Sequence, residues 1–201
     1  DTPTPFDDEG NGTGNYCTLN PLECGSNLNL ADGNLSGSSP GANWGAVLGT
    51  IGMSAGLWYW EVDCNTSEDT ACSIAKQGNI DLNYSGQITA HTDHEAWGII
   101  ANGNKQHKGT STSYGSSHTQ YDVVGVAFDA DNGDLYFYVN GVLQDSGTAA
   151  FTGLTDGPYI PSVSNFGHHS GVDRTFYINF GQRAFEYTPP TGYLALNTYN
   201  L

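Results

Sequence analysis

Residues 121–147 read YDVVGVAFDADNGDLYFYVNGVLQDSG and contain two Asn-Gly pairs, Asn132-Gly133 and Asn140-Gly141. Each pair separates runs of apolar and aromatic residues. Asn-Gly is the dipeptide that a two-residue type I′ hairpin turn favours, because both of its residues need a positive φ. Over residues 135–139, apolar side chains alternate with tyrosines, and a period of two is typical of a strand. The stretch therefore predicts a three-stranded meander with a two-residue turn at each Asn-Gly pair.

The remainder of the 201 residues also favours β-structure. Gly, Tyr, Phe and Trp are plentiful, Lys and Arg together number only 5, and no window shows the 3.6-residue period of a helix. We predict further strands at Asn27–Leu30, Gly33–Leu35, Trp44–Ile51, Leu57–Val62, Gln87–Thr89, Ala96–Ile100, Tyr159–Val163 and Thr175–Phe180. Short strands at this density predict one β-sandwich or barrel domain over residues 17–201, after an N-terminal arm or linker at residues 1–16. The polar stretch Gly103–Ser117 predicts one long surface loop.

The charge balance limits the partners that the protein can have. Its formal net charge is −16, from 21 acidic and 5 basic residues. Nucleic acids and anionic membranes repel such a surface, so neither is an expected partner. High net charge favours solubility, or attraction to cations and basic partners. No apolar run approaches the ~20 residues of a membrane-spanning helix. Because the chain starts at Asp1, we expect it to be processed, truncated or part of something longer.

Four cysteines form two local pairs, Cys17/Cys24 and Cys64/Cys72. Neither pair has the CxxC spacing of a zinc site, and each flanks a polar, loop-like segment. Disulfides Cys17–Cys24 and Cys64–Cys72 are the simplest of the three pairings that four cysteines allow, and they would imply an oxidising location. The alternative is four unpaired thiols.

Five motifs occur in order along the chain. They are WYWEV at residues 58–62, DVVGVAFD at 122–129, LYFYVNG at 135–141, PYIPSV at 158–163 and NFG at 179–181. Together they resemble the SPRY (B30.2-like) domain over about residues 44–187. The resemblance implies an all-β fold, a concanavalin A-like antiparallel β-sandwich with the N-terminal arm added.

The ending NFGQRAFEYTPPTGY, residues 179–193, resembles SPRY-like modules in virion-associated proteins of tailed, especially marine, phages. Ala184 departs from that pattern, which usually has Pro there. The resemblance implies a non-enzymatic structural or adhesion module of a phage tail, fibre or decoration protein, outside the cell or on the virion surface. Its partners would be other virion proteins or a host-surface protein or glycan, and self-association into a homo-oligomer stays open. The alternative function is a lectin-like carbohydrate-binding domain of a secreted bacterial protein.

Three groups of residues suggest chemistry without establishing it. Glu61 and Asp63 form an i, i+2 carboxylate pair such as glycosidases need, but the SPRY pattern has a structural Glu at residue 61. The acidic stretch Asp129–Asp134 superficially resembles a calcium loop, but Asn140 stands where an EF-hand has its bidentate Glu, so we predict a hairpin turn. His91 and His94 lack a third ligand at a fixed spacing. We therefore expect no catalytic residue, no metal and no cofactor.

Binding is expected in loops between strands, where variation leaves the core intact. Tyr114 is the preferred candidate, since we expect its ring to be exposed among Ser, Gly and Thr residues. A structural role within the loop is the alternative for Tyr114. The candidate binding residues are Trp44, His91, His94, Trp97, Tyr114, His118, Asn165, His168 and His169.

Overall fold

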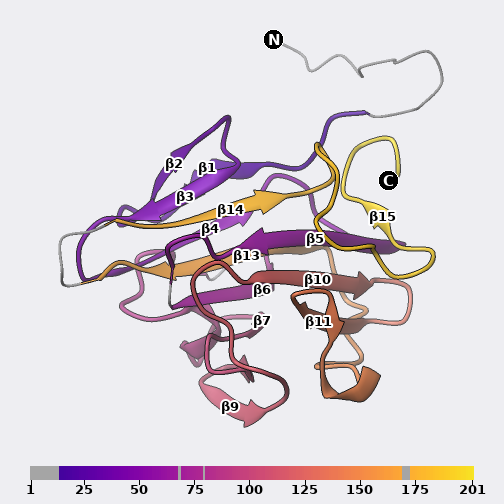
Figure 1. Cartoon of the computed structure of the whole chain (residues 1–201). Helices are drawn as coiled ribbons and strands as arrows, with labels where there is room; N and C mark the ends of the chain where they lie inside the picture. Colours follow the sequence, from indigo (N-terminus) through magenta and orange to yellow (C-terminus); the bar gives the residue numbers. More distant parts are fainter. Residues whose placement is uncertain (1–13, 68, 79, 169–172) are drawn as a thin grey trace.

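The computed structural model describes residues 14–67, 69–78, 80–168 and 173–201, and these form two β-sheets packed face to face (Figure 1). The first sheet has the strand order β1 (Leu19–Cys24), β4 (Trp44–Gly49), β13 (Tyr159–Phe166), β6 (Thr70–Lys76), β7 (Ala96–Ile99), β8 (Asn104–His107) and β9 (Thr110–Ser113). The second has the order β12 (Val142–Leu143), β11 (Asp134–Val139), β10 (Val123–Asp129), β5 (Leu57–Asp63), β14 (Arg174–Asn179), β3 (Ser36–Ser39) and β2 (Asn29–Ala31). The predicted all-β sandwich is confirmed.

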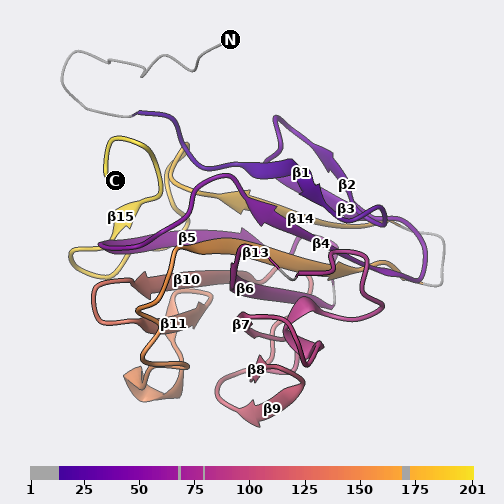
Figure 2. The same cartoon turned by 180° about the vertical axis from the view of Figure 1, so that it is seen from behind.

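Strand pairing is antiparallel throughout the two sheets, except that β15 (Leu194–Ala195) pairs parallel to β5. Two short 3₁₀ turns, η1 (Ile88–Ala90) and η2 (Asp145–Gly147), are the only helical turns in the described residues. Figure 2 shows the same two layers from behind. None of the described residues forms a helix long and apolar enough to cross a membrane.

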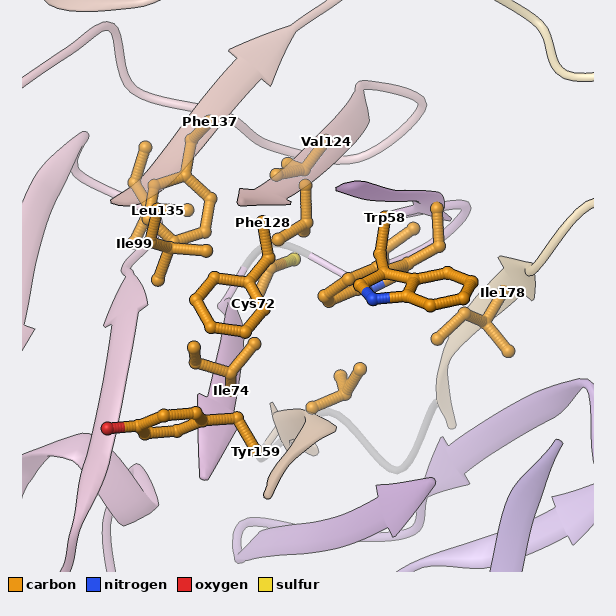
Figure 3. Packing of buried hydrophobic residues seen from close by; sticks show 14 of the residues in the cluster. Trp58, Cys72, Ile74, Ile99, Val124, Phe128, Leu135, Phe137, Tyr159 and Ile178 are labelled. Carbon is orange, nitrogen blue, oxygen red and sulfur yellow. The ribbon is translucent and has the colours of Figure 1, made fainter. Parts of the chain in front are cut away.

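The core lies between the two sheets and is rich in aromatic rings. Phe128 of β10 meets Tyr159 of β13 edge to face, with ring centroids 5.4 Å apart, so the contact joins one sheet to the other. Figure 3 shows these rings with Trp58, Ile74 and Cys72 in the same apolar cluster. Edge-to-face pairs add to the stabilisation that comes from burying the rings. The predicted alternation over residues 135–139 is confirmed, because the odd-numbered side chains of β11 are buried.

The two Asn-Gly pairs differ in structure. Asn140-Gly141 forms the predicted two-residue turn, with φ of 49° and 75° between the paired residues Val139 and Val142. Asn132-Gly133 does not, because the last residue pair of β10 and β11 is Asp129–Asp134, which leaves a four-residue loop. The Asp129 carboxylate accepts hydrogen bonds from the backbone N–H of Asp131 (3.1 Å) and Asn132 (2.9 Å), which favours the wider loop.

Two other local predictions are wrong. Residues 103–117 are not one surface loop, because β8 and β9 form a hairpin within them. Gln87–Thr89, predicted as a strand, overlaps the turn η1. Strand β6 was not predicted. It lies in the middle of the first sheet between β13 and β7 and consists largely of small residues, which carry little strand pattern.

All four cysteines are free, so the predicted disulfides Cys17–Cys24 and Cys64–Cys72 are wrong. The Cys17 thiol lies 3.7 Å from the Thr50 hydroxyl, whereas the Cys24 thiol donates to the carbonyl oxygen of Leu28 at 3.5 Å, so the two have different surroundings. Cys64 and Cys72 are fully buried in the apolar core. Burial raises the pKa of Cys64 to about 12, which leaves almost none of the reactive thiolate at neutral pH.

A thiol titration without reductant checks this correction. We expect four reactive thiols per chain in denaturant, and in the native state at most the half-buried Cys24 within the first minutes. Burial and the raised pKa of the other thiols explain the protection. Fewer than four thiols in denaturant would mean that disulfides form after all.

A pair of glycine substitutions tests the four-residue loop. Gly133 and Gly33 have similar φ, 74° and 66°, but a Cβ on Gly133 would lie 2.3 Å from the backbone nitrogen of Leu154, and one on Gly33 would meet nothing within 4 Å. We expect Gly33→Ala to lower the free energy of unfolding by about 1 kcal/mol, the cost of a left-handed backbone alone. Gly133→Ala should cost at least about 1 kcal/mol more because of overpacking. Urea denaturation measures both, and equal losses would contradict the packing of Gly133 against Leu154.

Candidate functional site

The connection between β6 and β7 forms an open pocket of about 550 Å³. Its lining residues are Ile80, Asp81, His91, Asp93 and His94, all from residues 80–94. Long connections without strand structure are uncommon in compact domains and often carry function. This pocket is the candidate binding site, and it contains two of the predicted binding residues, His91 and His94.

Two imidazole rings form one wall of the pocket. The rings of His91 and His94 stack with centroids 4.0 Å apart and an interplanar angle of 16°. The ring of Tyr84 packs edge-on against both, at 4.7 Å from His91 and 6.0 Å from His94. The three rings fix one another, so the wall is formed before any ligand arrives.

Hydrogen bonds give the two histidines different roles. His94 Nδ1 donates to the carbonyl oxygen of Ile88 (3.0 Å), and Nε2 accepts from the backbone N–H of Asp81 (2.9 Å). His94 is therefore neutral, and burial lowers its pKa. His91 Nδ1 accepts from the backbone N–H of Asp93 (3.2 Å). Nε2 of His91 and the Asp93 carboxylate have no partner among the described residues, so both can serve a ligand.

Two more predicted residues, Trp44 and His168, lie at the end of β13. Trp44 pairs with Phe166 across β4 and β13, and their rings lie 5.3 Å apart. Both side chains are half-buried, as is that of His168. His169, also predicted, lies outside the described residues. This group keeps its place as a predicted binding surface.

Three other predicted binding residues are packed inside the domain. Tyr114 is 5% exposed and its hydroxyl donates to the carbonyl oxygen of Thr148 (2.9 Å), so the prediction of an exposed ring is wrong. Trp97 is buried and stacks on His107, with centroids 4.5 Å apart. His118 is 2% exposed and its Nε2 donates to the carbonyl oxygen of Thr70 (2.9 Å). These three side chains therefore pack inside the domain and are not exposed for binding.

Asn165 is also buried, at the centre of a polar network between the two sheets. Its Nδ2 donates to Ser39 Oγ (3.2 Å) and to the carbonyl oxygen of Arg174 (2.7 Å). Its Oδ1 accepts from the hydroxyls of Ser67 and Thr70. Every hydrogen-bonding group of this amide is satisfied, which a buried amide requires. The role of Asn165 in this structure is to close one end of the sandwich.

Two of the acidic candidates, Glu61 and Asp129, bind backbone N–H groups of the domain itself. Glu61 is 3% exposed, and its carboxylate accepts from the backbone N–H of Glu186 (2.8 Å) and Tyr187 (2.9 Å) and from the Tyr59 hydroxyl (3.1 Å). Asp129 holds its own loop, as described above. Among the described residues, no group of three or more His, Cys, Asp or Glu side chains is arranged to hold a metal ion.

The sequence model of the SPRY domain matches residues 57–181, more than half of the chain. The chain belongs to the SPRY family. SPRY domains are protein–protein interaction modules, so the resemblance seen in the sequence is confirmed at this level.

Similar proteins carry the domain within longer chains. ATP-dependent RNA helicase DDX1 of Xenopus laevis is 27% identical over 188 residues, covering 91% of this chain and 23% of that protein. SPRY domain-containing SOCS box protein 3 of Xenopus tropicalis is 28% identical over 102 residues, covering 47% of this chain and 28% of that protein. The chain thus spans about a quarter of the length of the curated relatives it matches.

Solved structures share the fold. The SPRY domain of human HERC1 superimposes with a TM-score of 0.63 at 19% identity, covering 83% of this chain and 99% of that one. Stonustoxin superimposes with a TM-score of 0.59 at 22% identity, covering 82% of this chain and 27% of that one.

The sequence predicted His91 and His94 but not the other lining residues, Ile80, Asp81 and Asp93, nor Tyr84, which packs against the two imidazoles. No motif marks these four residues, and the only available signal was the polar character of the segments on either side of the predicted strand Gln87–Thr89. Their grouping depends on the fold of residues 80–94, which brings Asp81 within hydrogen-bonding distance of His94.

The buried His118 predicts a pH dependence of stability. Burial lowers its pKa below the ordinary 6.5, and its Nδ1 has no hydrogen-bond partner, so the folded state resists protonation. Below about pH 6.5 the unfolded chain therefore binds more protons at this position than the folded chain does. The free energy of unfolding is at its full value above about pH 6.5 and falls as the pH drops below it. We expect His118→Gln, which keeps a donor for Thr70, to make the fall in the free energy of unfolding between pH 7 and pH 5 shallower. A difference of one bound proton changes the free energy of unfolding by at most about 1.4 kcal/mol per pH unit. Identical slopes for the two proteins would contradict a buried neutral His118.

Proposed function

We propose that this SPRY domain is a non-enzymatic binding module that captures a protein partner at the pocket of residues 80–94. The observation that carries the proposal is the pair of free polar groups there, His91 Nε2 and the Asp93 carboxylate, beside a rigid wall of stacked rings. A concave site with a few fixed polar groups is the usual form of a recognition pocket.

The chemistry of the pocket supports binding rather than catalysis. His94 cannot act as a base without losing its hydrogen bond from Asp81, because that bond occupies the only lone pair on the ring. Because His91 Nδ1 accepts from the backbone N–H of Asp93, the neutral ring carries its proton on Nε2, which is free to donate. The free Asp93 carboxylate accepts. The pocket therefore suits a partner segment that presents both a hydrogen-bond acceptor and a donor, such as a backbone or side-chain amide.

We further propose that the domain acts as a structural or adhesion module of a virion, such as a phage tail, fibre or decoration protein. The support is the stretch from Asn179 to Tyr193, whose sequence resembles the ending of virion-associated modules. A net charge of −16 also suits a surface exposed to the medium. The partner would be another virion protein, a further copy of the domain, or a protein or glycan on a host cell.

Paired variants test the pocket. A random peptide library selected on the wild-type domain provides ligands, and calorimetry then measures their affinity for His91→Ala and Asp93→Asn. We expect each variant to weaken binding about tenfold, the loss of one hydrogen bond to a charged or desolvated group. Asp145→Asn is the control, because it makes the same charge change at the exposed turn η2.

Two outcomes would overturn the proposal. If the selected peptides bind both pocket variants as tightly as the wild type, the site lies elsewhere. If no peptide is selected and a glycan array yields a sugar whose binding Asp93→Asn abolishes, the domain is a lectin. Labelled domain on candidate host cells, with and without protease treatment of those cells, tests the adhesion role separately.

A further inference from the structure

A second pocket lies on the opposite face of β5 from the core. Side chains alternate along this strand, so Trp58, Trp60 and Val62 enter the core while Glu61 and Asp63 face outward. The pocket has a volume of about 540 Å³, and Glu61, Asp63, Tyr121, Val123, Arg183 and Tyr187 are among its lining residues. β10 and β14 flank β5 in the sheet, and the C-terminal segment crosses its outer face (Figure 1).

The floor of this pocket carries a buried negative charge without a counter-ion. Glu61 is 3% exposed, and its three hydrogen-bond donors are two backbone amides and a tyrosine hydroxyl, all neutral. The two salt bridges between described residues, Lys76–Asp156 and Lys108–Glu95, lie elsewhere. A carboxylate in a poorly solvated site attracts a cation more strongly than one in water does.

The walls reinforce the negative charge of the floor. Asp63 and Glu186 also line the pocket, and among the described residues neither forms a salt bridge. Asp63 Oδ1 accepts from the backbone N–H of Asn65 (2.7 Å), and its other oxygen has no partner there. Arg183 is the only basic residue in the lining, so three carboxylates face one guanidinium.

An exposed aromatic ring completes the site. Tyr121 lines the pocket and is 71% exposed, a high exposed fraction for so large a side chain. Its backbone N–H donates to the carbonyl oxygen of Asn65 (2.9 Å), which holds it beside the turn that follows Asp63. A tyrosine ring attracts an ammonium or guanidinium group over its face. The ring and the carboxylates together favour the same kind of group, an ammonium or a guanidinium.

We propose that this pocket binds a lysine or arginine side chain of a partner peptide. The carboxylates of Glu61 and Asp63 supply negative charge, and the ring of Tyr121 covers the cation from the rim. Arg183 partly offsets the negative charge and so limits binding to a single positive group. The pocket is large enough for a long basic side chain. The net charge of −16 draws basic segments toward the domain before they dock. This site shares no lining residue with the pocket of residues 80–94.

Three substitutions test the proposal on the whole chain, two that should weaken binding and one that should tighten it. Fluorescein-labelled trilysine is the probe and triglutamate the negative probe. We expect Asp63→Asn to weaken trilysine binding about fivefold or more, since a charge near the cation is lost. Arg183→Gln should tighten it by a similar factor. Tyr121→Leu should weaken it about two- to fivefold, the range of an exposed cation–π contact. A gain in affinity on Arg183→Gln cannot come from misfolding.

Asp145→Asn again serves as the charge-matched control, and its affinity should stay within about twofold of the wild type. Amide NMR shifts on trilysine addition should concentrate at residues 63, 121 and 183. Equal weakening by Asp63→Asn and Asp145→Asn would show that trilysine follows only the diffuse negative field and would overturn the proposal. So would an unchanged affinity in Arg183→Gln. Trilysine binding should be unaffected by His91→Ala, which separates this test from that of the first pocket.

Discussion

Strand β5 is buried on both of its faces, and the rest of the fold depends on this constraint. One face places Trp58, Trp60 and Val62 in the core between the sheets. The other places Glu61 beneath the C-terminal segment, where backbone N–H groups of Glu186 and Tyr187 bind the carboxylate. A buried carboxylate is costly unless its hydrogen bonds are satisfied. The C-terminal segment is therefore needed to complete the sandwich, and the sandwich in turn fixes the path of that segment.

The same requirement for satisfied polar groups separates the structural loop residues from those available to a partner. Tyr114, His118 and Asn165 come from polar, Gly-rich stretches, yet each is buried with its polar groups bonded to backbone or to neighbouring side chains, except for Nδ1 of His118. His91 and Asp93 come from a similar stretch and keep free groups at the surface. Composition alone does not distinguish the two kinds of residue. The difference lies in whether a strand from elsewhere in the chain covers them.

The excess of acidic residues leaves carboxylates without a counter-ion in both pockets. Basic residues are few, and two of them, Lys76 and Lys108, are engaged in salt bridges. Carboxylates at the surface consequently outnumber the cations that could neutralise them, and a partner that offers hydrogen-bond donors or positive charge gains most from contact. The first pocket attracts such a partner through the carboxylates of Asp81 and Asp93, and the second through Glu61 and Asp63 with the ring of Tyr121.

Features that depend on neighbours along the chain could be predicted from the amino-acid sequence. The alternation over residues 135–139 and the Asn140-Gly141 turn follow from local backbone geometry, and the ordered motifs identified the SPRY fold. Features that depend on distant segments became visible only in the folded chain. The loop at Asn132-Gly133 is set partly by Leu154, the four thiols are free, and Glu61 meets Glu186 across 125 residues. Burial and long-range hydrogen bonding are properties of the packed chain, and no local pattern encodes which side chain will be covered.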